Sequence, residues 1–427
     1  MDEVVDIPFK ERSIAGLVFL LTLGLALRII WVGLVPNKQV ADFKMYDDMA
    51  ASFYRGHGYV DAIGRPSAFK PPGYPLLLAL MYHVVGESPF AAKVVQANMS
   101  VLLCLLVFLL TRRLFGERRA FIALVLCLFH PTFIFSVTLL GTEIPFACLV
   151  TCAVLLLALR PEGAHLPSRD VALAGLAFGA AGLMRPMALL SPIALLFWLV
   201  VDWRGFKESL RILIVFGMAL ALPILPWTVR NYVHFKKLVP VSTNGGYNLF
   251  YGHNPLGEVV WLPFNRLQSL PDFPTEAQWF QMDEPSRSSY MQKLAKEYIW
   301  TDPAGVFRRM PIKFYLLMLS PDVPSLYWNI EGLPTERKPT KKTLTLLASL
   351  NRVFAYGILL FSVIGLFSAG LSDRRLAFMY GLVGIWILFH LIYWGKPRFR
   401  FPMVPFMIIL AAGPMASFSA SLRRLTR

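Results

Sequence analysis

The stretch "SIAGLVFLLTLGLALRIIWVGLV", residues 13–35, is a continuous apolar run with a single charged residue, Arg28. A helix needs about 20 mostly apolar residues to cross the hydrocarbon core of a bilayer. Because the run is continuous rather than alternating, it indicates a spanning helix and not a strand of a membrane barrel. A charge inside such a span is expected to reach for the interface or to face the helix bundle.

The composition of the whole chain agrees with a membrane protein. Of the 427 residues, 56% are hydrophobic and only 16% are charged, whereas soluble domains carry about 25% charged residues. The net charge of +16 would suggest nucleic acid in a soluble protein. In a membrane protein it is first a sign of topology, and partly of contact with anionic lipids. We therefore expect no nucleic-acid partner.

Further apolar runs predict an all-α polytopic membrane protein with about ten transmembrane helices. The expected spans are 13–35, 90–110, 120–139, 144–159, 171–184, 187–201, 212–227, 354–370, 377–394 and 401–418. A shorter apolar patch at 314–319 is too short to cross and is expected to be re-entrant or interfacial.

Basic residues gather in the short segments "TRRLFGERR" (111–119), "DWRGFKESLR" (202–211), "SDRR" (372–375) and "SLRRLTR" (421–427). All four fall on one side of the membrane if both chain ends are cytoplasmic. Two long polar segments, 36–89 and 228–353, then lie on the outer face. We accordingly divide the chain into a transmembrane module (1–227), an outer loop region (228–353) and C-terminal transmembrane helices (354–427).

The first outer segment contains "VADFKMYDDMAASFYRGHGYV", residues 40–60. Apolar residues recur at helical spacing from Tyr46 to Phe53, and Gly56 provides a stop. This predicts a short amphipathic helix on the membrane surface, with Asp42 at its entry near the mouth of the bundle. Two interpretations of Asp42 remain open here: a capping or solvated acid, or a general base poised by partial desolvation.

Other charges occupy the same face. Glu143 begins the span 144–159, where the helix dipole alone would stabilise an acid, and Arg185 sits in a tight turn between two spans, a position that usually lines a polar cavity. Further cations are Lys70, Arg230, Lys396, Arg398 and Arg400. Arginine binds phosphate through a planar fork and lysine as a point charge. The pattern indicates a membrane enzyme or transporter for a phospholipid-like substrate.

The motifs occur in an order that resembles a known family. They are Asp42, Tyr46, Ala50, Gly56, Gly58 and Tyr59, then "FKPPGYPLLLAL" (69–80), "LLGTEIPF" (139–146), "LMRP" (183–186), "PWTVRNY" (226–232), "STNGGYNLFYGHNP" (242–255) and "PRFRFPMVP" (397–405). This series resembles glycosyltransferase family 39 of the GT-C superfamily, which includes protein mannosyltransferases and the aminoarabinose transferases of lipid A.

The resemblance implies a GT-C fold and an inverting sugar transfer from a polyprenyl-phosphate donor on the periplasmic face of the bacterial inner membrane. The acceptor would be lipid A, a glycan, another lipid or a protein. In this family the acid at the position of Asp42 is the general base, and Glu143 matches a second acid that positions the acceptor or the base. Lys70, Arg398 and Arg400 match groups that contact the donor phosphate. The remaining substrate-binding candidates are Tyr46, Arg185 and Arg230.

The chain departs from both named subgroups. Phe69 stands where the aminoarabinose transferases carry an acid, and Phe43 follows Asp42 where the protein mannosyltransferases carry a second acid. We therefore expect no required metal and no cofactor apart from the lipid-linked donor. A flippase or transporter of a lipid-linked saccharide is the main alternative, and a polysaccharide polymerase is another. The concentration of candidate residues on one face favours an enzyme over a transporter.

Overall fold

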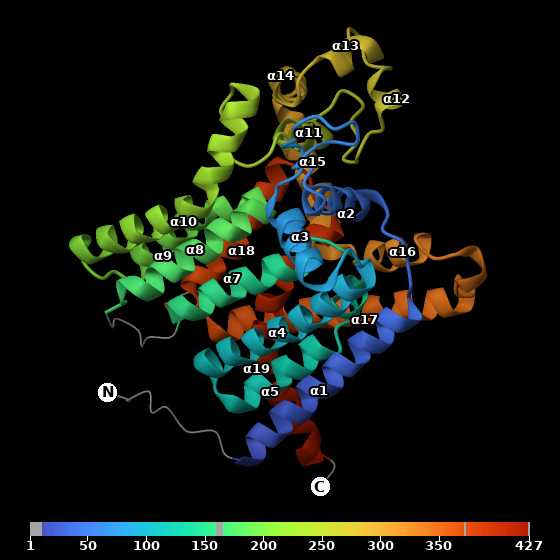
Figure 1. Cartoon of the computed structure of the whole chain (residues 1–427). Helices are drawn as coiled ribbons and strands as arrows, with labels where there is room; N and C mark the ends of the chain where they lie inside the picture. The colour runs from blue at the N-terminus through green and yellow to red at the C-terminus, as the bar shows by residue number, and fades with distance from the viewer. Residues whose placement is uncertain (1–10, 159–164, 371–372, 426–427) are drawn as a thin grey trace.

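The computed structural model describes residues 11–158, 165–370 and 373–425, and within these ranges every regular element is a helix (Figure 1). The longest helices are α1 (Glu11–Leu34), α4 (Pro89–Phe115), α10 (Phe206–Phe235), α17 (Lys341–Ala369) and α19 (Val404–Leu425), the last preceded by the 3₁₀ turn η5 (Pro397–Met403). Shorter helices of the bundle are α5 (Glu117–Leu128), α6 (Pro131–Phe135), α7 (Glu143–Ala158), α8 (Ser168–Met184), α9 (Ser191–Val201) and α18 (Ala377–Ile392). The all-α membrane fold is confirmed.

Each of the ten expected spans corresponds to a helical segment, but the segments differ in length. Among the described residues, five helices are long and apolar enough to cross a membrane, or six if α5 and the segment that follows it, bent by 52°, form one span. The other four expected spans are α7, α8, α18 and the pair η2 (Pro186–Leu190) and α9. Polar residues shorten three of these four helices: Glu143 begins α7, while Arg185 and Pro186 separate α8 from α9.

The helix ends also differ from the expected segment boundaries. The boundary at 227/228 falls inside α10, which continues to Phe235 past two prolines, and the boundary at 353/354 falls inside α17. The apolar patch 314–319 is not a separate element, because α15 (Pro303–Phe314) continues directly into the π-helix η3 (Tyr315–Leu319).

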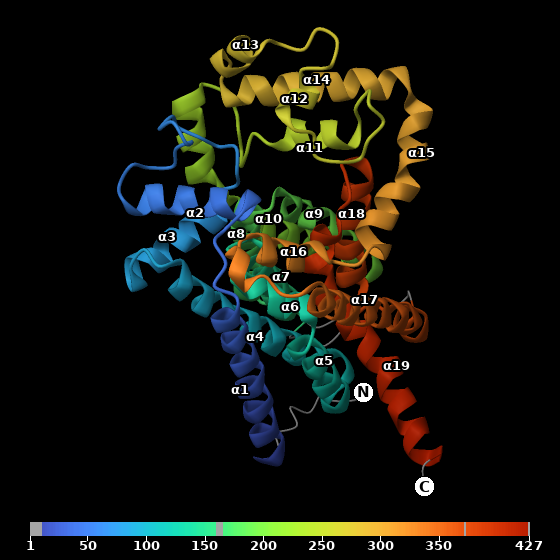
Figure 2. The ribbon, with the colours of Figure 1, turned by 90° about the vertical axis from the view of Figure 1, so that its right-hand side faces the viewer.

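The outer segments form a second layer of short helices. They are α2 (Ala41–Tyr54), α3 (Gly73–Val85), α11 (Gly245–Gly252), α12 (Phe264–Leu267), α13 (Glu276–Gln281), α14 (Glu284–Thr301) and α16 (Pro324–Glu331). Helices α11 to α14 lie at the end of the molecule opposite the start of α1 and the end of α19, and α15 descends from them toward α17 (Figures 1 and 2). The expected amphipathic helix is confirmed as α2, which buries Tyr46, Met49 and Ala50.

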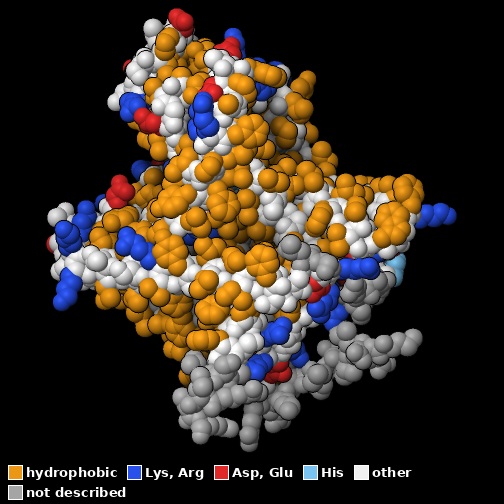
Figure 3. Space-filling view, turned by 180° about the vertical axis from the view of Figure 1, so that it is seen from behind, with side chains coloured by type: hydrophobic (Ala, Val, Ile, Leu, Met, Phe, Trp, Pro, Cys, Tyr) orange, Lys and Arg blue, Asp and Glu red, His pale blue; other side chains and the backbone are white. Residues whose placement is uncertain are grey.

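Two of the basic turns meet at the other end of the bundle. Arg375 donates to the Leu114 carbonyl, and Arg118 donates to the Ala416 carbonyl near the end of α19. Two of the predicted basic segments and α19 therefore lie side by side, while the side chains of the tail 421–427 lie outside the described residues. On the face seen in Figure 3, apolar side chains cover much of the surface between the two ends.

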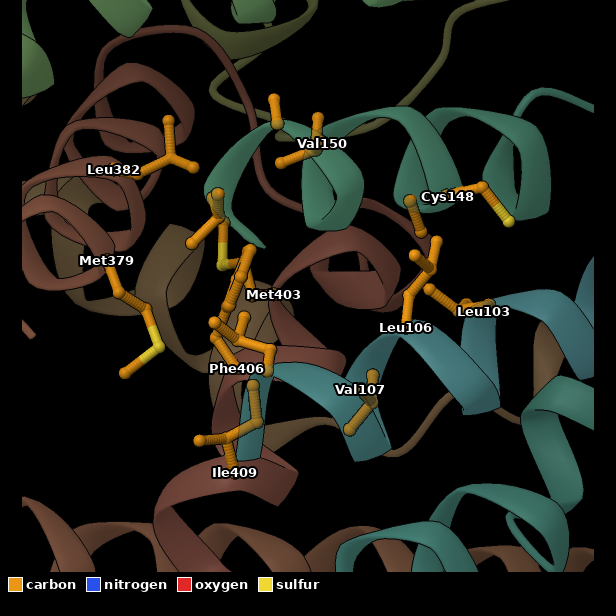
Figure 4. Close-up of a cluster of buried hydrophobic side chains, with 14 of the residues drawn as sticks. Leu103, Leu106, Val107, Cys148, Val150, Met379, Leu382, Met403, Phe406 and Ile409 are labelled. Carbon is orange, nitrogen blue, oxygen red and sulfur yellow. The ribbon is translucent and has the colours of Figure 1, made fainter. Parts of the chain in front are cut away.

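The bundle core is largely apolar. Leucine, valine, methionine and phenylalanine side chains from α4, α7, α18 and α19 meet in its centre (Figure 4). Arg28 is fully buried beside this core and donates to Ser100 Oγ (2.8 Å), the Gly24 carbonyl (2.9 Å) and the Leu128 carbonyl (3.1 Å). Of the two expected orientations, Arg28 therefore faces the bundle, where backbone carbonyls satisfy its donors.

Helices α8 and α10 pack with their backbones in close contact. The sequence "GLAFG" places Gly175 and Gly179 one turn apart on α8. A Cβ atom at these positions would lie 2.5 Å from the Phe216 carbonyl oxygen and 2.3 Å from the Leu220 carbonyl oxygen, respectively. Small residues at this spacing allow close approach of membrane helices, for which apolar burial supplies little driving force.

This contact makes Gly179 intolerant of a side chain. We expect Gly179→Val to cost about 1–3 kcal/mol through overpacking and to lower the apparent melting temperature of the detergent-solubilised protein. Gly217→Val on the facing helix is the matched control, because a Cβ atom there meets nothing within 4 Å. Equal melting temperatures of the two variants would contradict the close packing.

Candidate active site

Asp42 lies in the first turn of α2, at the inner edge of the outer layer. Ala41, the residue before it, has φ +50°, which lies in the left-handed region that non-glycine residues rarely adopt. Such strain costs on the order of 1 kcal/mol or more and persists only where the surroundings impose it. The backbone here is held in place by the contacts of its neighbours.

Each oxygen of the Asp42 carboxylate accepts from one cation. Lys70 Nζ lies 2.7 Å from Oδ1, and a terminal nitrogen of Arg398 lies 3.0 Å from Oδ2. Lys70 comes from the loop before α3, whereas Arg398 belongs to η5, 356 residues after Asp42. The first and last outer loops of the chain thus meet at this carboxylate.

Arg398 also holds the second acid. Its Nε donates to the Glu143 carboxylate, and Arg185 donates to the same oxygen at 2.5 Å. Arg185 Nε in turn donates to Thr142 Oγ1 at 2.7 Å. We call Asp42, Lys70, Glu143, Arg185 and Arg398 the charge cluster. With three cations and two acids it carries one surplus positive charge.

Aromatic rings enclose the cluster. The Arg398 guanidinium lies 4.5 Å from the Phe43 ring centre and 5.3 Å from that of Trp328. Lys70 Nζ lies 5.9 Å from the ring centre of Tyr46, the predicted substrate-binding tyrosine on α2, and 5.4 Å from that of Phe69. Such rings attract cations and limit access of water, which strengthens every charge interaction between them.

A glycine leaves room for this arrangement. A Cβ atom at Gly141 would lie 2.6 Å from Glu143 Oε2 and 2.7 Å from the Phe43 ring. Any side chain at position 141 would therefore push the Glu143 carboxylate or the Phe43 ring away from Arg398.

The two acids differ in accessibility. The Asp42 side chain is 43% exposed, whereas that of Glu143 is only 8% exposed. A dissolved or membrane-borne molecule can therefore reach Asp42, while Glu143 is enclosed by its arginines. The geometry separates one reachable carboxylate from one that holds the cations in place.

The neighbours of Asp42 control its protonation. Burial alone would raise the pKa of Asp42, but Lys70 and then Arg398 outweigh it and hold this pKa well below its usual range. Burial lowers the pKa of Lys70, and the Asp42 carboxylate more than compensates, so that the pKa of Lys70 is raised. Both groups are therefore charged at neutral pH.

Two of the predicted site arginines lie outside the charge cluster. Arg230 donates to the Ser67 carbonyl at 2.7 Å and the Tyr59 carbonyl at 2.8 Å, and so supports the first outer loop. Arg400 donates to the carbonyls of Leu317 and Met318 in η3. Both arginines therefore donate to backbone carbonyl oxygens and not to the carboxylates of Asp42 or Glu143.

The sequence indicates Lys396 only as a cation of the outer face and not as a substrate-binding candidate, and it gives no indication of Trp328. Lys396 lies 4.2 Å from the Trp394 ring centre, and burial lowers its pKa to about 8 despite the nearby Asp42 carboxylate. Its place two residues before Arg398 was a usable signal. Trp328 has no such signal, because only the folding of α16 beneath α2 brings it to Phe43. Among the described residues, no group of three or more His, Cys, Asp or Glu side chains is placed to hold a metal ion.

Comparisons with known proteins bear on the fold and on one segment of the sequence. Residues 69–227 match the family model described as dolichyl-phosphate-mannose-protein mannosyltransferase. No curated protein matches the chain.

Solved structures of membrane glycosyltransferases share the fold. The archaeal oligosaccharyltransferase AglB from Archaeoglobus fulgidus, in complex with an inhibitory peptide and a dolichol-phosphate, aligns with TM-score 0.54 and 16% identity over 97% of this chain and 51% of that chain. The apo form of the oligosaccharyltransferase from that organism gives TM-score 0.55 and 16% identity with the same coverage. ArnT from Cupriavidus metallidurans bound to undecaprenyl phosphate gives TM-score 0.47 and 14% identity over 92% of this chain and 78% of that chain.

The chain spans about half the length of the archaeal enzyme, 51% of it, so the likeness concerns the fold. The resemblance drawn from the order of the motifs is confirmed at that level: the chain has the expected GT-C fold, and residues 69–227 match the mannosyltransferase family model.

Proposed function

We propose that the chain is an inverting glycosyltransferase that moves a sugar from a polyprenyl-phosphate donor to an acceptor hydroxyl. The observation that carries this proposal is the solvent-reachable Asp42 carboxylate, paired with Lys70 and Arg398 inside a cluster with surplus positive charge. The match of residues 69–227 to a dolichyl-phosphate-mannose-dependent family supports a lipid-linked donor. The basic turns at the opposite end support cytoplasmic chain ends and a periplasmic site in a bacterial inner membrane.

The donor phosphate takes the cations that now bind Asp42. Lys70 and Arg398 present donors that suit a phosphate, and Lys396 adds a third charge from the same outer turn as Arg398. The apolar bundle beside them accommodates a polyprenyl tail. Fixed cations in a water-poor site also stabilise the negative charge that develops on the phosphate as it leaves.

Donor binding converts Asp42 into a better base. In the unloaded site the two cations keep the pKa of Asp42 low, so its carboxylate binds a proton weakly. A phosphate that draws Lys70 and Arg398 away removes this effect and adds a nearby negative charge, and both changes raise the proton affinity of a carboxylate. The general base thus becomes active only when the donor is present.

The chemical step then proceeds in one displacement. The acceptor oxygen attacks the anomeric carbon from the face opposite the phosphate, while Asp42 takes its proton. The bond between the anomeric carbon and the phosphate oxygen breaks, and that oxygen keeps the electron pair. The products are the glycosylated acceptor with inverted configuration and polyprenyl phosphate. Glu143 acts as a positioning residue, because it holds Arg398 and Arg185 and is itself enclosed.

Removal of the carboxylate charge tests the base. We expect Asp42→Asn to lower transfer from a panel of polyprenyl-phosphate pentoses and hexoses to membrane extracts by at least about 100-fold, the usual contribution of a general base. Asp47→Asn on the same helix is the control, because its carboxylate accepts from Tyr82 and lies outside the charge cluster. Equal transfer by wild type and Asp42→Asn would contradict the assignment. Donor binding without any transfer by the wild type would favour the flippase.

The pH dependence of the transfer reaction tests whether Lys396 binds the donor. Lys396 is charged below its pKa of about 8 and loses its charge as the pH rises through that value. We therefore expect kcat/KM for the donor to stay level from pH 5 to 7, since the pKa of Asp42 lies below that window, and to fall about tenfold above pH 8. Lys396→Arg, which stays charged, is expected to remove the alkaline loss. An unchanged alkaline loss in that variant would exclude Lys396 from donor binding.

A further inference from the structure

A cavity of about 820 Å³ lies beside α2, outside the charge cluster. Four segments form its walls. They contribute Met45 and Met49 of α2, Phe69 before α3, Tyr247 of α11, and, from the segment 280–287, Phe280 of α13 and Arg287 of α14. Binding sites for small molecules have volumes of about 300–1,000 Å³ and combine apolar walls with a few placed polar groups. The cavity matches this description, and neither the base nor the donor cations use it.

The cavity adjoins the proposed base. Its α2 wall contains Met45, Met49 and Ser52, which follow Asp42 by three, seven and ten residues and therefore share its face of the helix. Phe69 lines the same cavity and is the residue before Lys70, whose Nζ lies 5.4 Å from its ring centre. A molecule seated in the cavity extends along α2 toward the carboxylate, on the side of the outer helices rather than of the bundle.

The polar groups of the cavity include one that lacks a partner. Arg287 Nε is buried and makes no hydrogen bond, and an unsatisfied buried donor costs roughly 1–3 kcal/mol. Glu284, one helical turn away, already accepts from Ser67 Oγ at 2.7 Å and the Ala68 backbone amide at 2.8 Å. These bonds fix the loop 57–69, which forms one wall of the cavity. The cavity is therefore held open in advance of any ligand.

The mixture of groups suits one chemical class. Phe69, Tyr247 and Phe280 present aromatic surface, while Arg287 and the carboxylates of the wall present donors and acceptors side by side. Sugar hydroxyls both donate and accept, and the C–H faces of sugar rings pack on aromatic rings. A fatty acyl chain offers no hydrogen-bonding group to the polar side chains that line this cavity.

We propose that this cavity binds the acceptor, and that the acceptor is a saccharide whose ring packs on Tyr247 and whose oxygen accepts from Arg287. The inference rests on the proposed sugar transfer and adds the class of acceptor to it. The hydroxyl to be glycosylated then extends past Met45 to Asp42, and the donor sugar arrives from the bundle side.

The experiment uses the full chain in lipid nanodiscs, a radiolabelled polyprenyl-phosphate sugar from the panel above, and membrane extract as the acceptor source. We expect Arg287→Gln and Tyr247→Ala each to raise the half-saturating amount of extract at least about tenfold, with the donor KM unchanged. Arg266→Gln is the matched control, because this arginine is exposed and pairs with Glu258 away from the cavity. Periodate oxidation of the extract is expected to abolish its acceptor activity, whereas protease treatment is expected to preserve it.

The outcomes separate this inference from the function on which it rests. Release of sugar to water without extract measures the donor reaction alone, so it shows for the wild type and for each variant whether that reaction is intact. If neither variant changes the response to extract, the cavity is not the acceptor site although the enzyme is a transferase. If protease rather than periodate destroys acceptor activity, the acceptor is a protein. If neither the wild type nor any of the variants releases or transfers sugar, the proposed function itself fails.

Discussion

The structure of the outer face depends on one guanidinium, that of Arg398, which two carboxylates share. Asp42 belongs to the first outer loop, Glu143 begins a helix of the bundle, and Arg398 lies in the last outer turn. Removing one partner of a buried ion pair typically costs about 3–5 kcal/mol, because it leaves an uncompensated charge. The three segments are therefore held together by charges that none of them can satisfy alone. The surplus cation that remains is the property from which the proposed phosphate binding follows.

The need to bring these charges together also explains where the α-helices of the bundle are interrupted. Helix α7 begins at Glu143 and α8 ends just before Arg185, while Arg398 lies in the 3₁₀ turn η5 that precedes α19. A straight span would hold these charges in lipid, whereas an interrupted one brings them to a protein-lined site at its mouth.

The sequence predicted the spanning helices and α2, because hydropathy is a local signal. The order of the motifs also predicted that the five residues of the charge cluster lie on the same side of the membrane. The sequence failed where a contact depends on segments distant in the chain. Arg230 and Arg400 occupy motif positions, yet they bind backbone carbonyls of neighbouring loops. Trp328, which packs on Arg398, belongs to the short helix α16, whose sequence has no recognisable pattern. The cavity beside α2 was equally hidden, since four segments form it together.

The most direct test of this account is the affinity for undecaprenyl phosphate, which carries the phosphate without the sugar. If the Asp42 carboxylate and the phosphate compete for Lys70 and Arg398, removing the carboxylate charge favours the phosphate. The account therefore predicts that Asp42→Asn binds undecaprenyl phosphate about tenfold more tightly than the wild type. Equal or weaker binding by Asp42→Asn would show that the phosphate does not take these cations, and would contradict the mechanism at its first step.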